Sequence, residues 1–129
     1  MHYEACPELA PVVLEARALD LQIGLAFKPE TSAAYAAHAA ISSKVDIVLC
    51  MSIEPGYSGQ EFMPEALDRI RTVRSVLPEH VPVQVDGGIG PENIKAVRDA
   101  GASLCVAGTS IFGREDLPRA YRRLLEELK

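Results

Sequence analysis

Short apolar runs alternate with amphipathic stretches along the whole chain. Runs of strand length occupy residues 21–27, 45–51, 81–85 and 103–107, and a shorter run occupies residues 2–5. Apolar positions recur at helical spacing over residues 7–18, 31–41, 64–76, 91–100 and 117–128. Because such spacing indicates amphipathic helices and short bounded apolar runs indicate strands, the pattern predicts five units, each a strand followed by a helix.

Residues at the ends of the predicted helices support these boundaries. Pro64 and Pro91 lie at helix starts, where the first turn tolerates proline. Ser32 and Asp116 are suited to cap helix N-termini, because their side-chain oxygens can accept hydrogen bonds from free backbone amides. Gly101 directly follows the fourth helical stretch, the usual position for a glycine that ends a helix.

The longer apolar runs do not alternate with polar residues, which is typical of strands covered on both faces of a sheet. Repeated strand–helix units of this kind predict parallel strands joined by right-handed crossovers. The expected fold class is therefore α/β, with a single domain over residues 1–129.

Three glycine-bearing turns each follow an apolar run and precede a helical pattern. They are Glu-Pro-Gly-Tyr-Ser-Gly-Gln at residues 54–60, Asp-Gly-Gly-Ile-Gly at residues 86–90 and Ala-Gly-Thr-Ser at residues 107–110. Glycine lets backbone amides approach an anion closely, and a following helix N-terminus adds the positive end of its dipole. At the carboxyl ends of neighbouring strands, the three turns would form one phosphate site, with Asp86 at its mouth.

Two architectures fit this pattern. An open doubly wound sheet binds its ligand where the strand order reverses, usually with one dominant phosphate loop. A (β/α)8 barrel commonly holds phosphate with its last loops and a short extra helix, and its complete form needs about 250 residues. Glycine turns after three consecutive strands, with a short segment at residues 109–112 before the final helix, favour part of a barrel.

Composition and charge narrow the class of partner. Of the 129 residues, 48% are hydrophobic and 24% charged, as in ordinary globular domains. The net charge of −5 argues against nucleic acid, which requires a basic face. No apolar run approaches the ~18 residues of a membrane span, and no secretion signal is recognisable. The cysteines, Cys6, Cys50 and Cys105, lack metal-binding spacing, so we expect reduced thiols and a cytoplasmic protein.

The turns and their flanking runs resemble the ribulose-phosphate 3-epimerase family. The runs GLAFKPET, MSIEPGYSGQEF, VDGGI and VAGTSIF begin at residues 24, 51, 85 and 106. In order and spacing they are similar to the family's segments after strands five to eight, and residues 2–5 are similar to its fourth strand. The resemblance implies a partial (β/α)8 TIM barrel that lacks the first three β/α units.

The resemblance also implies a chemistry. Family members are isomerases of carbohydrate metabolism that interconvert two pentose phosphates, ribulose 5-phosphate and xylulose 5-phosphate. They move a proton at C3 through an enediolate held by a divalent metal such as Zn, Fe, Mn or Co. Asp86 matches a catalytic acid–base residue that is also a metal ligand. Residues expected to bind the substrate or its phosphate are Met51, Gly56, Tyr57, Ser58, Gly59, Gly87, Gly88, Gly108 and Thr109.

One departure from the family pattern affects these expectations. Ser58 stands where the family usually has glycine, although a hydroxyl can still donate to phosphate. Met51 could equally be a core residue or the wall of the sugar site.

Arg69, Arg71 and Arg74 share one helical stretch, and we interpret all three as its exposed face.

The family's other catalytic residues have no counterpart here. The second carboxylate belongs to a His-x-Asp element, and a further metal-binding histidine lies on the third strand. His2, His38 and His80 match neither. The metal site is therefore expected to be incomplete and the chain weak or inactive alone. A non-catalytic sugar-phosphate-binding half-barrel remains an alternative. A third possibility is a half-barrel completed by a partner. Unpaired strand edges at residues 2–5 and 103–107 predict a homo-oligomer or poor solubility.

Overall fold

A four-stranded parallel sheet forms the centre of the molecule. The computed structural model describes residues 1–57 and 59–129. The sheet order is β1-β2-β3-β4, the order of the strands along the chain. The strands are β1 (Gly24–Phe27), β2 (Ile47–Met51), β3 (Val83–Asp86) and β4 (Leu104–Val106).

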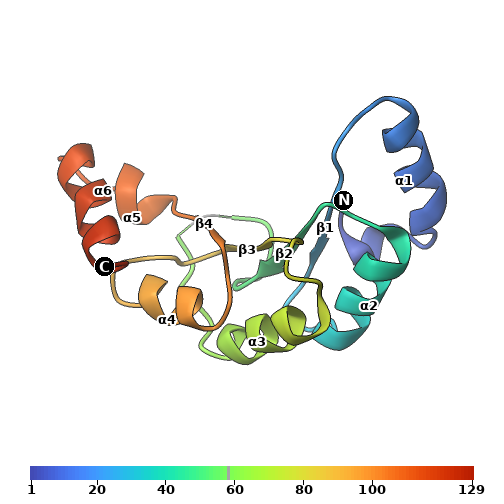
Figure 1. Cartoon of the computed structure of the whole chain (residues 1–129). Helices are drawn as coiled ribbons and strands as arrows, with labels where there is room; N and C mark the ends of the chain where they lie inside the picture. Colours follow the sequence, from blue (N-terminus) through green and yellow to red (C-terminus); the bar gives the residue numbers. More distant parts are fainter. Residues whose placement is uncertain (58) are drawn as a thin grey trace.

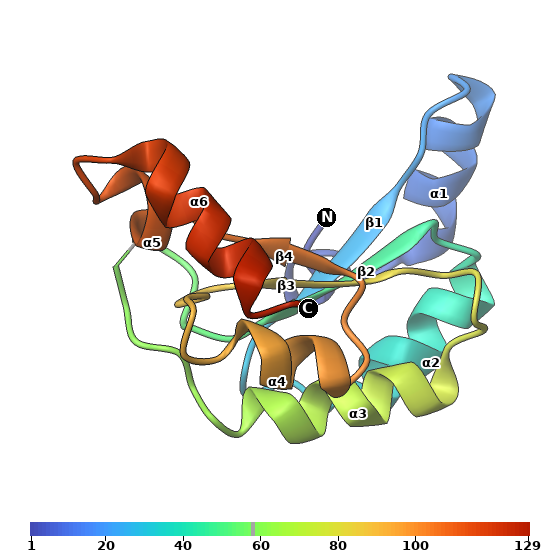
Figure 2. The same cartoon turned by 60° about the vertical axis from the view of Figure 1, so that its left-hand side comes forward.

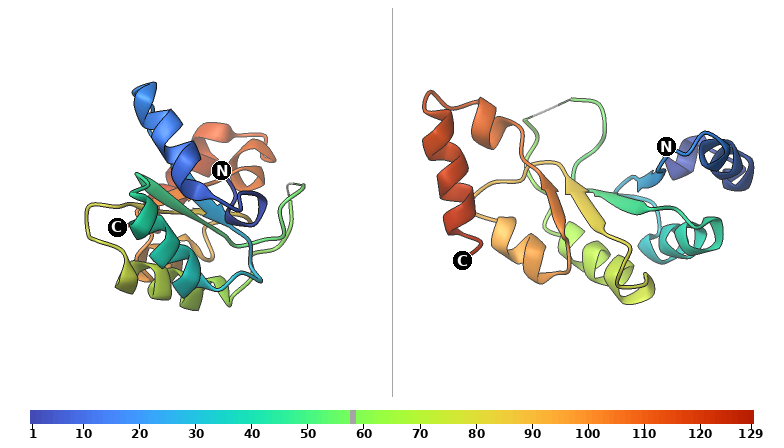
Figure 3. Two further views of the ribbon diagram at one scale, coloured as in Figure 1. Left: turned by 90° about the vertical axis from the view of Figure 1, so that its right-hand side faces the viewer. Right: turned by 45° about the horizontal axis from the view of Figure 1, so that its top comes forward.

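Helices cover one side of this sheet and rise at both of its ends. They are η1 (Tyr3–Ala5), α1 (Leu9–Ala18), α2 (Ala33–Ser43), α3 (Ala66–Val76), α4 (Ile94–Asp99), α5 (Thr109–Phe112) and α6 (Leu117–Glu126). Helices α2, α3 and α4 line the outer side, whereas α1 stands at one end and α5 with α6 at the other (Figures 1 and 2). In the part of the chain that the structure describes, no helix covers the inner side (Figure 3).

This topology distinguishes the two architectures that the sequence allowed. A doubly wound sheet reverses its strand order and carries helices on both faces. Here each strand pairs in parallel with the next strand along the chain, and helices α2 to α4 lie on one side. The molecule is therefore a segment of an α/β barrel, and the predicted fold class is confirmed.

The core lies between the sheet and the outer helices. Its fully buried strand residues are Leu25, Phe27, Val48, Cys50, Val83 and Val85. Ala36 and Ala37 of α2 are also fully buried, as are Ile70 and Val73 of α3. Alanines allow α2 to lie close to the sheet, and each large apolar side chain removed from water stabilises the fold by about 1.5–3 kcal/mol.

The prediction of a strand at residues 2–5 is wrong. His2 forms a single parallel bridge with β1, and Tyr3–Ala5 then make a 3-10 turn. The turn brings the Glu4 carboxylate to the amide of Lys28, which donates to it over 2.8 Å. The Glu4 side chain can contact the loop after β1 only if the backbone at residues 3–5 leaves the direction of the sheet. This contact therefore replaces the predicted strand.

The predicted helix ends agree with the structure in three places. The Ser32 hydroxyl accepts a hydrogen bond from the amide of Tyr35, and the Asp116 carboxylate accepts one from Arg119 at 2.9 Å. Gly101 follows α4 with a φ of +114°, a conformation that side-chain-bearing residues rarely adopt. In the described part of the chain, no helix has the length and apolar character needed to cross a membrane.

Two of the three arginines interpreted as an exposed face have structural roles. Arg74 donates to the carbonyl oxygens of Leu77 and Val81, both at 2.8 Å, and so holds the segment between α3 and β3. Arg69 donates to the carbonyl of Met51 at 3.2 Å. Only Arg71 is exposed, where it pairs with Asp68 one turn earlier. Long arginine stems therefore cover core residues while the guanidinium groups bind backbone carbonyls.

Candidate functional site

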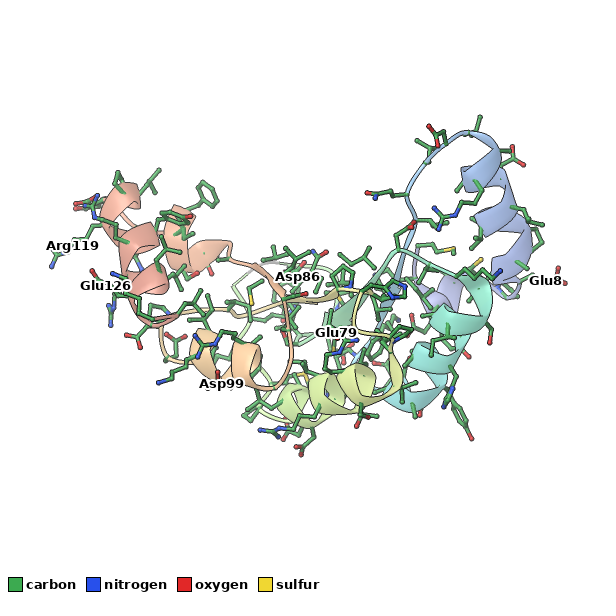
Figure 4. The ribbon with its side chains drawn as sticks, viewed as in Figure 1. Glu8, Glu79, Asp86, Asp99, Arg119 and Glu126 are labelled. Carbon is green, nitrogen blue, oxygen red and sulfur yellow. The ribbon has the colours of Figure 1, made fainter. Side chains whose placement is uncertain are left out.

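The three glycine-bearing turns begin at the same edge of the sheet. Met51, at the end of β2, lies in register with Asp86, at the end of β3, which in turn lies in register with Val106, at the end of β4. Since parallel strands end on the same side, the turns that follow them are neighbours. Figure 4 places Asp86 near the middle of the molecule, between the two ends where α1 and α6 rise.

The turn after β3 is built against the loop after β2. Gly87 has a φ of +122°, and a Cβ atom there would lie 2.9 Å from the backbone nitrogen of Ile53. Gly88 has a φ of +61°, and its Cβ would lie 2.8 Å from the Cα of Phe62. Both positions therefore require glycine for backbone conformation and for close packing, independently of any ligand.

Ser52 joins the same two segments, and sequence reasoning did not identify it. It is fully buried, and its hydroxyl lies 2.9 Å from the carbonyl oxygen of Asp86 and 2.7 Å from that of Gly87. Its backbone amide also donates to Asp86, at 2.8 Å. A serine directly after a buried apolar strand was the available signal, because a buried hydroxyl requires partners.

Asn93 fixes the far end of this turn and was also missed. Its side-chain amide donates to the carbonyl of Gly88 at 2.8 Å, and its side-chain oxygen accepts from the amide of Gly90 at 3.0 Å. The turn is therefore held from within, before any ligand binds. Asparagine three residues after a glycine is a frequent turn pattern and could have been recognised.

A cavity of about 570 Å³ lies where the three turns meet. Its walls include Gln60 from the first turn, Gly88 from the second and Thr109 from the third. Gly59 also lies near the third turn, since a Cβ atom there would be 3.9 Å from the Thr109 methyl group. Residues from all three predicted turns therefore line or border one cavity.

Several other predicted site residues do not line this cavity. Gly56, Tyr57, Gly87 and Gly108 are absent from its lining, and Ser58 lies outside the described residues. Tyr57 is 72% exposed. Gly108 faces open space, because a Cβ atom there would have no neighbour within 4 Å among the described residues.

Two further polar side chains reach the cavity. Arg114 and Ser110 line it, and both also line an adjoining pocket of about 390 Å³. The Ser110 hydroxyl is buried and has no hydrogen-bond partner within residues 1–57 and 59–129. Over the same ranges, Arg114 forms no ion pair. A free hydroxyl and a free guanidinium are both donors suited to an oxyanion.

Several backbone amides at the cavity are also free. The amides of Gly88, Gly108 and Thr109 donate no hydrogen bond to the described part of the chain. Thr109 begins α5, and the first amides of a helix have no partner within it. The cavity therefore offers neutral donors and one cation, and the side chains of Glu61 and Glu92 also line it.

Asp86 stands apart from this donor group. It is half-buried on the inner side of the sheet and does not line the cavity. Among residues 1–57 and 59–129, its carboxylate accepts no hydrogen bond and pairs with no cation. A carboxylate in this position can take up or deliver a proton.

The described residues do not fit a divalent metal ion. Nowhere among them do three or more His, Cys, Asp or Glu side chains come together in a group that could hold a metal. Divalent ions such as Zn²⁺ need at least three protein ligands in catalytic sites. Asp86 alone would supply one such ligand.

Met51 and the neighbouring Cys50 carry no evident acid–base chemistry. Met51 is 7% exposed, so it is largely a core residue whose carbonyl is held by Arg69. Burial raises the pKa of the Cys50 thiol to about 11, although the nearby Arg69 guanidinium opposes the shift. Burial likewise raises the pKa of Cys105. Neither thiol is poised as a nucleophile, which requires the thiolate.

The fold is a β/α barrel segment with three glycine-bearing turns at one edge of its sheet, and the comparisons identify its family. The model of the Ribulose-phosphate 3 epimerase family matches residues 1–112. The chain therefore belongs to the ribulose-phosphate 3-epimerase family.

Several curated relatives are ribulose-phosphate 3-epimerases. Ribulose-phosphate 3-epimerase of Chlamydia muridarum is 34% identical over 130 residues, which cover 97% of this chain and 56% of the relative. The enzyme of Escherichia coli K12 is 37% identical over 109 residues, covering 82% and 46%, and that of Schizosaccharomyces pombe is 38% identical over 111 residues, covering 86% and 47%. The chain thus spans about half the length of these relatives.

Solved structures show the same fold at lower identity. A crystal structure of 3-hexulose-6-phosphate synthase superposes with a TM-score of 0.69 at 24% identity, covering 92% of this chain and 55% of that one. The structure of the Amycolatopsis orientalis BexX/CysO complex gives a TM-score of 0.66 at 24% identity, with 95% and 50% covered. These likenesses concern architecture alone.

Proposed function

We propose that this chain binds the phosphate of a pentulose 5-phosphate where its three glycine turns meet. We further propose that, on its own, it interconverts ribulose 5-phosphate and xylulose 5-phosphate weakly or not at all. The observation that carries the proposal is the cavity of about 570 Å³, to which three consecutive strand-to-helix turns contribute. The domain responsible is residues 1–129 as a whole.

The donors around the cavity suit a phosphate monoester. Free amides at Gly88, Gly108 and Thr109 can hydrogen-bond its oxygens without contributing charge. Arg114 supplies a compensating cation, and the Ser110 hydroxyl supplies a further donor. These donors support binding of one anion by an acidic chain, and they share the cavity lining with the carboxylates of Glu61 and Glu92.

The remaining predicted residues take supporting roles in this proposal. Gly59 borders the phosphate from the β2 side, near Thr109. Gly56, Tyr57 and Ser58 stay predicted phosphate-binding residues of the same turn. Gly87 lets the second turn reach the cavity, and Met51 borders the sugar at the strand ends. Asp86 is the group that takes up or returns the C3 proton from one face of the sugar.

A single carboxylate explains the low activity that we propose. Epimerisation removes a proton from one face of a carbon and returns one to the opposite face, so two positioned groups are needed. The described residues offer no group of three possible metal ligands either, although the family resemblance implies a divalent metal. A non-catalytic sugar-phosphate-binding module is the second candidate, favoured by this solitary position of Asp86.

Calorimetry and a turnover assay on the purified chain test both candidates. We expect xylulose 5-phosphate to bind and unphosphorylated xylulose not to bind, because the cavity recognises the phosphate. We expect no turnover with added Zn²⁺, Mn²⁺ or Fe²⁺. Turnover at the rate of the E. coli relative would contradict the proposed inactivity, and absence of phosphate-dependent binding would contradict the proposed site.

A further inference from the structure

A second pocket adjoins the cavity of about 570 Å³ that we propose binds phosphate, called here the phosphate cavity. It has a volume of about 390 Å³ and lies between the segment that precedes α4 and the first half of α6, at the same end of the molecule (Figure 1). Arg114, Arg119 and Arg123 line this second space, which we call the arginine pocket. Ser110, Glu92 and Arg114 belong to both linings, so the two spaces share a wall.

The three arginines of this pocket lack an ionic partner in the described part of the chain. Within residues 1–57 and 59–129, none of their guanidinium groups belongs to an ion pair. Arg119 and Arg123 lie one turn apart on α6, and like charges at that spacing destabilise a helix. An anion bound between them would remove this repulsion. Three unpaired guanidinium groups at one pocket therefore indicate a site for an oxyanion, to which arginine forms strong charge-assisted hydrogen bonds.

The two acidic residues of the arginine pocket, Glu92 and Asp116, do not neutralise these arginines. The Asp116 carboxylate caps α6, where it accepts a hydrogen bond from the backbone amide of Arg119 at 2.9 Å. The Glu92 carboxylate lies against Gly90, since a Cβ atom at Gly90 would be 2.7 Å from its Oε2 atom. Neither carboxylate forms an ion pair with an arginine of the pocket. The guanidinium charge therefore stays available to a ligand.

The Ser110 hydroxyl is placed where the two spaces meet. Its oxygen is buried, Ser110 belongs to both linings, and the hydroxyl has no hydrogen-bond partner within residues 1–57 and 59–129. Buried polar groups are normally hydrogen-bonded, so an orphaned hydroxyl points to a ligand or a water molecule as its partner. A ligand that extends from one space into the other would pass this hydroxyl and accept a hydrogen bond from it.

We propose that the arginine pocket binds the second phosphate of a diphosphate group whose first phosphate occupies the phosphate cavity. The first phosphate meets neutral backbone donors and Arg114, whereas the second meets Arg119 and Arg123. A diphosphate carries more negative charge than a phosphate monoester, and the fork of a guanidinium group matches phosphate oxygens two at a time. The chain should therefore bind diphosphates more tightly than monophosphates. The proposed function enters only in that the phosphate cavity must accept a phosphate.

Calorimetry with pyrophosphate and inorganic phosphate tests this preference, in buffer without divalent metal and at about 150 mM salt, where unspecific charge attraction is screened. We expect pyrophosphate to bind at least about tenfold more tightly, the effect of one added charge-assisted hydrogen bond. Citrate, an anion of similar charge without phosphate geometry, should bind no more tightly than phosphate. ADP tests the esterified form: affinity equal to that of pyrophosphate supports an ester as the ligand, and lower affinity supports the free anion.

Arginine variants of α6 provide the matched comparison. Arg119→Gln and Arg123→Gln should each lower the affinity for pyrophosphate toward that for phosphate and affect xylulose 5-phosphate less, because both residues line the arginine pocket and not the phosphate cavity. Arg122→Gln is the control: it removes the same charge from the same helix, but Arg122 is exposed and outside the pocket lining. Circular dichroism and the melting temperature confirm that each variant is folded.

Three results would overturn the inference: pyrophosphate binding no tighter than phosphate, citrate binding as tight as pyrophosphate, or equal losses in Arg122→Gln and Arg123→Gln. If xylulose 5-phosphate still binds in any of these cases, the proposed function stands without the arginine pocket. Pyrophosphate binding that depends on Arg119 and Arg123, together with no binding of xylulose 5-phosphate, would support the arginine pocket and contradict the proposed pentulose 5-phosphate site.

Discussion

Buried side chains at the carboxyl ends of the strands determine the shape of the candidate site. Ser52 is the clearest case, because one hydroxyl bridges the carbonyls of Asp86 and Gly87 and so holds the second turn beside the first. Apolar packing could not replace it, since the Gly87 carbonyl would lose its donor, whereas the Asp86 carbonyl would keep the backbone amide of Ser52. The site is therefore organised by residues that have no contact with the proposed ligand.

Ser52→Ala should lower the free energy of unfolding by about 1–3 kcal/mol, the cost of leaving the Gly87 carbonyl without a donor. It should also weaken binding of xylulose 5-phosphate, because the second turn loses its anchor. Urea denaturation and calorimetry measure the two effects. Ser75→Ala is the control: its hydroxyl also donates to a backbone carbonyl but is exposed on α3, so stability should change by less than about 0.5 kcal/mol. Equal effects would contradict this account.

The Cys50 thiol should make stability fall at alkaline pH. Its pKa is raised by burial from 9.0 to about 11 in the folded chain. Between these values the unfolded chain has lost the thiol proton while the folded chain keeps it, so rising pH favours unfolding. Urea denaturation at about pH 8 and about pH 10.5 should show a larger loss for wild type than for Cys50→Ala, which lacks the group. The same loss in both chains would contradict the assignment.

At the scale of elements, two glycines of the candidate site differ in whether packing explains them. Gly88 has a positive φ and lies against Phe62, so its role in folding is sufficient to explain it. Gly108 has a φ of −95° and open space around the Cβ position. Packing therefore does not require glycine at this position.

Gly108→Ala should lower the melting temperature less than Gly88→Ala does, because the added methyl group meets no neighbour. It should weaken xylulose 5-phosphate binding about tenfold, because that methyl group blocks the anion from the amides. Gly88→Ala should lower both stability and binding, by about 1–3 kcal/mol in stability. Thermal unfolding and calorimetry distinguish the two patterns. Unchanged affinity in Gly108→Ala would remove the third turn from the proposed phosphate site.

At the scale of the whole molecule, the chain is an open barrel segment. This architecture forms the candidate site and also leaves it incomplete. Strand ends in register bring three distant turns together at one edge, while the inner face and the β4 edge remain without a partner in the described part of the chain. The homo-oligomer expected from open edges stays a prediction. Met1 and His2 contact β1 at the opposite edge of the sheet.

Much of the fold was predictable because it depends on local chemistry. Runs that are apolar on both faces require a covered parallel sheet, and Ser32, Gly101 and Asp116 mark helix ends through their own hydrogen bonds or backbone freedom. The turn order and the position of Asp86 at a strand end could be predicted for the same reason.

The remaining features depended on contacts between distant residues. Glu4 reaches across to Lys28 and turns residues 3–5 out of the sheet, Arg74 binds carbonyls of a loop, and Ser52 bridges two strands. None of these pairings leaves a periodic trace in the sequence.

The amino-acid sequence by itself determined the parallel β/α pattern and which turns could meet an anion, since these follow from hydrophobic spacing and glycine. Only the tertiary structure decided which glycines serve packing and which sheet edge stays open, because both depend on neighbours brought together by folding.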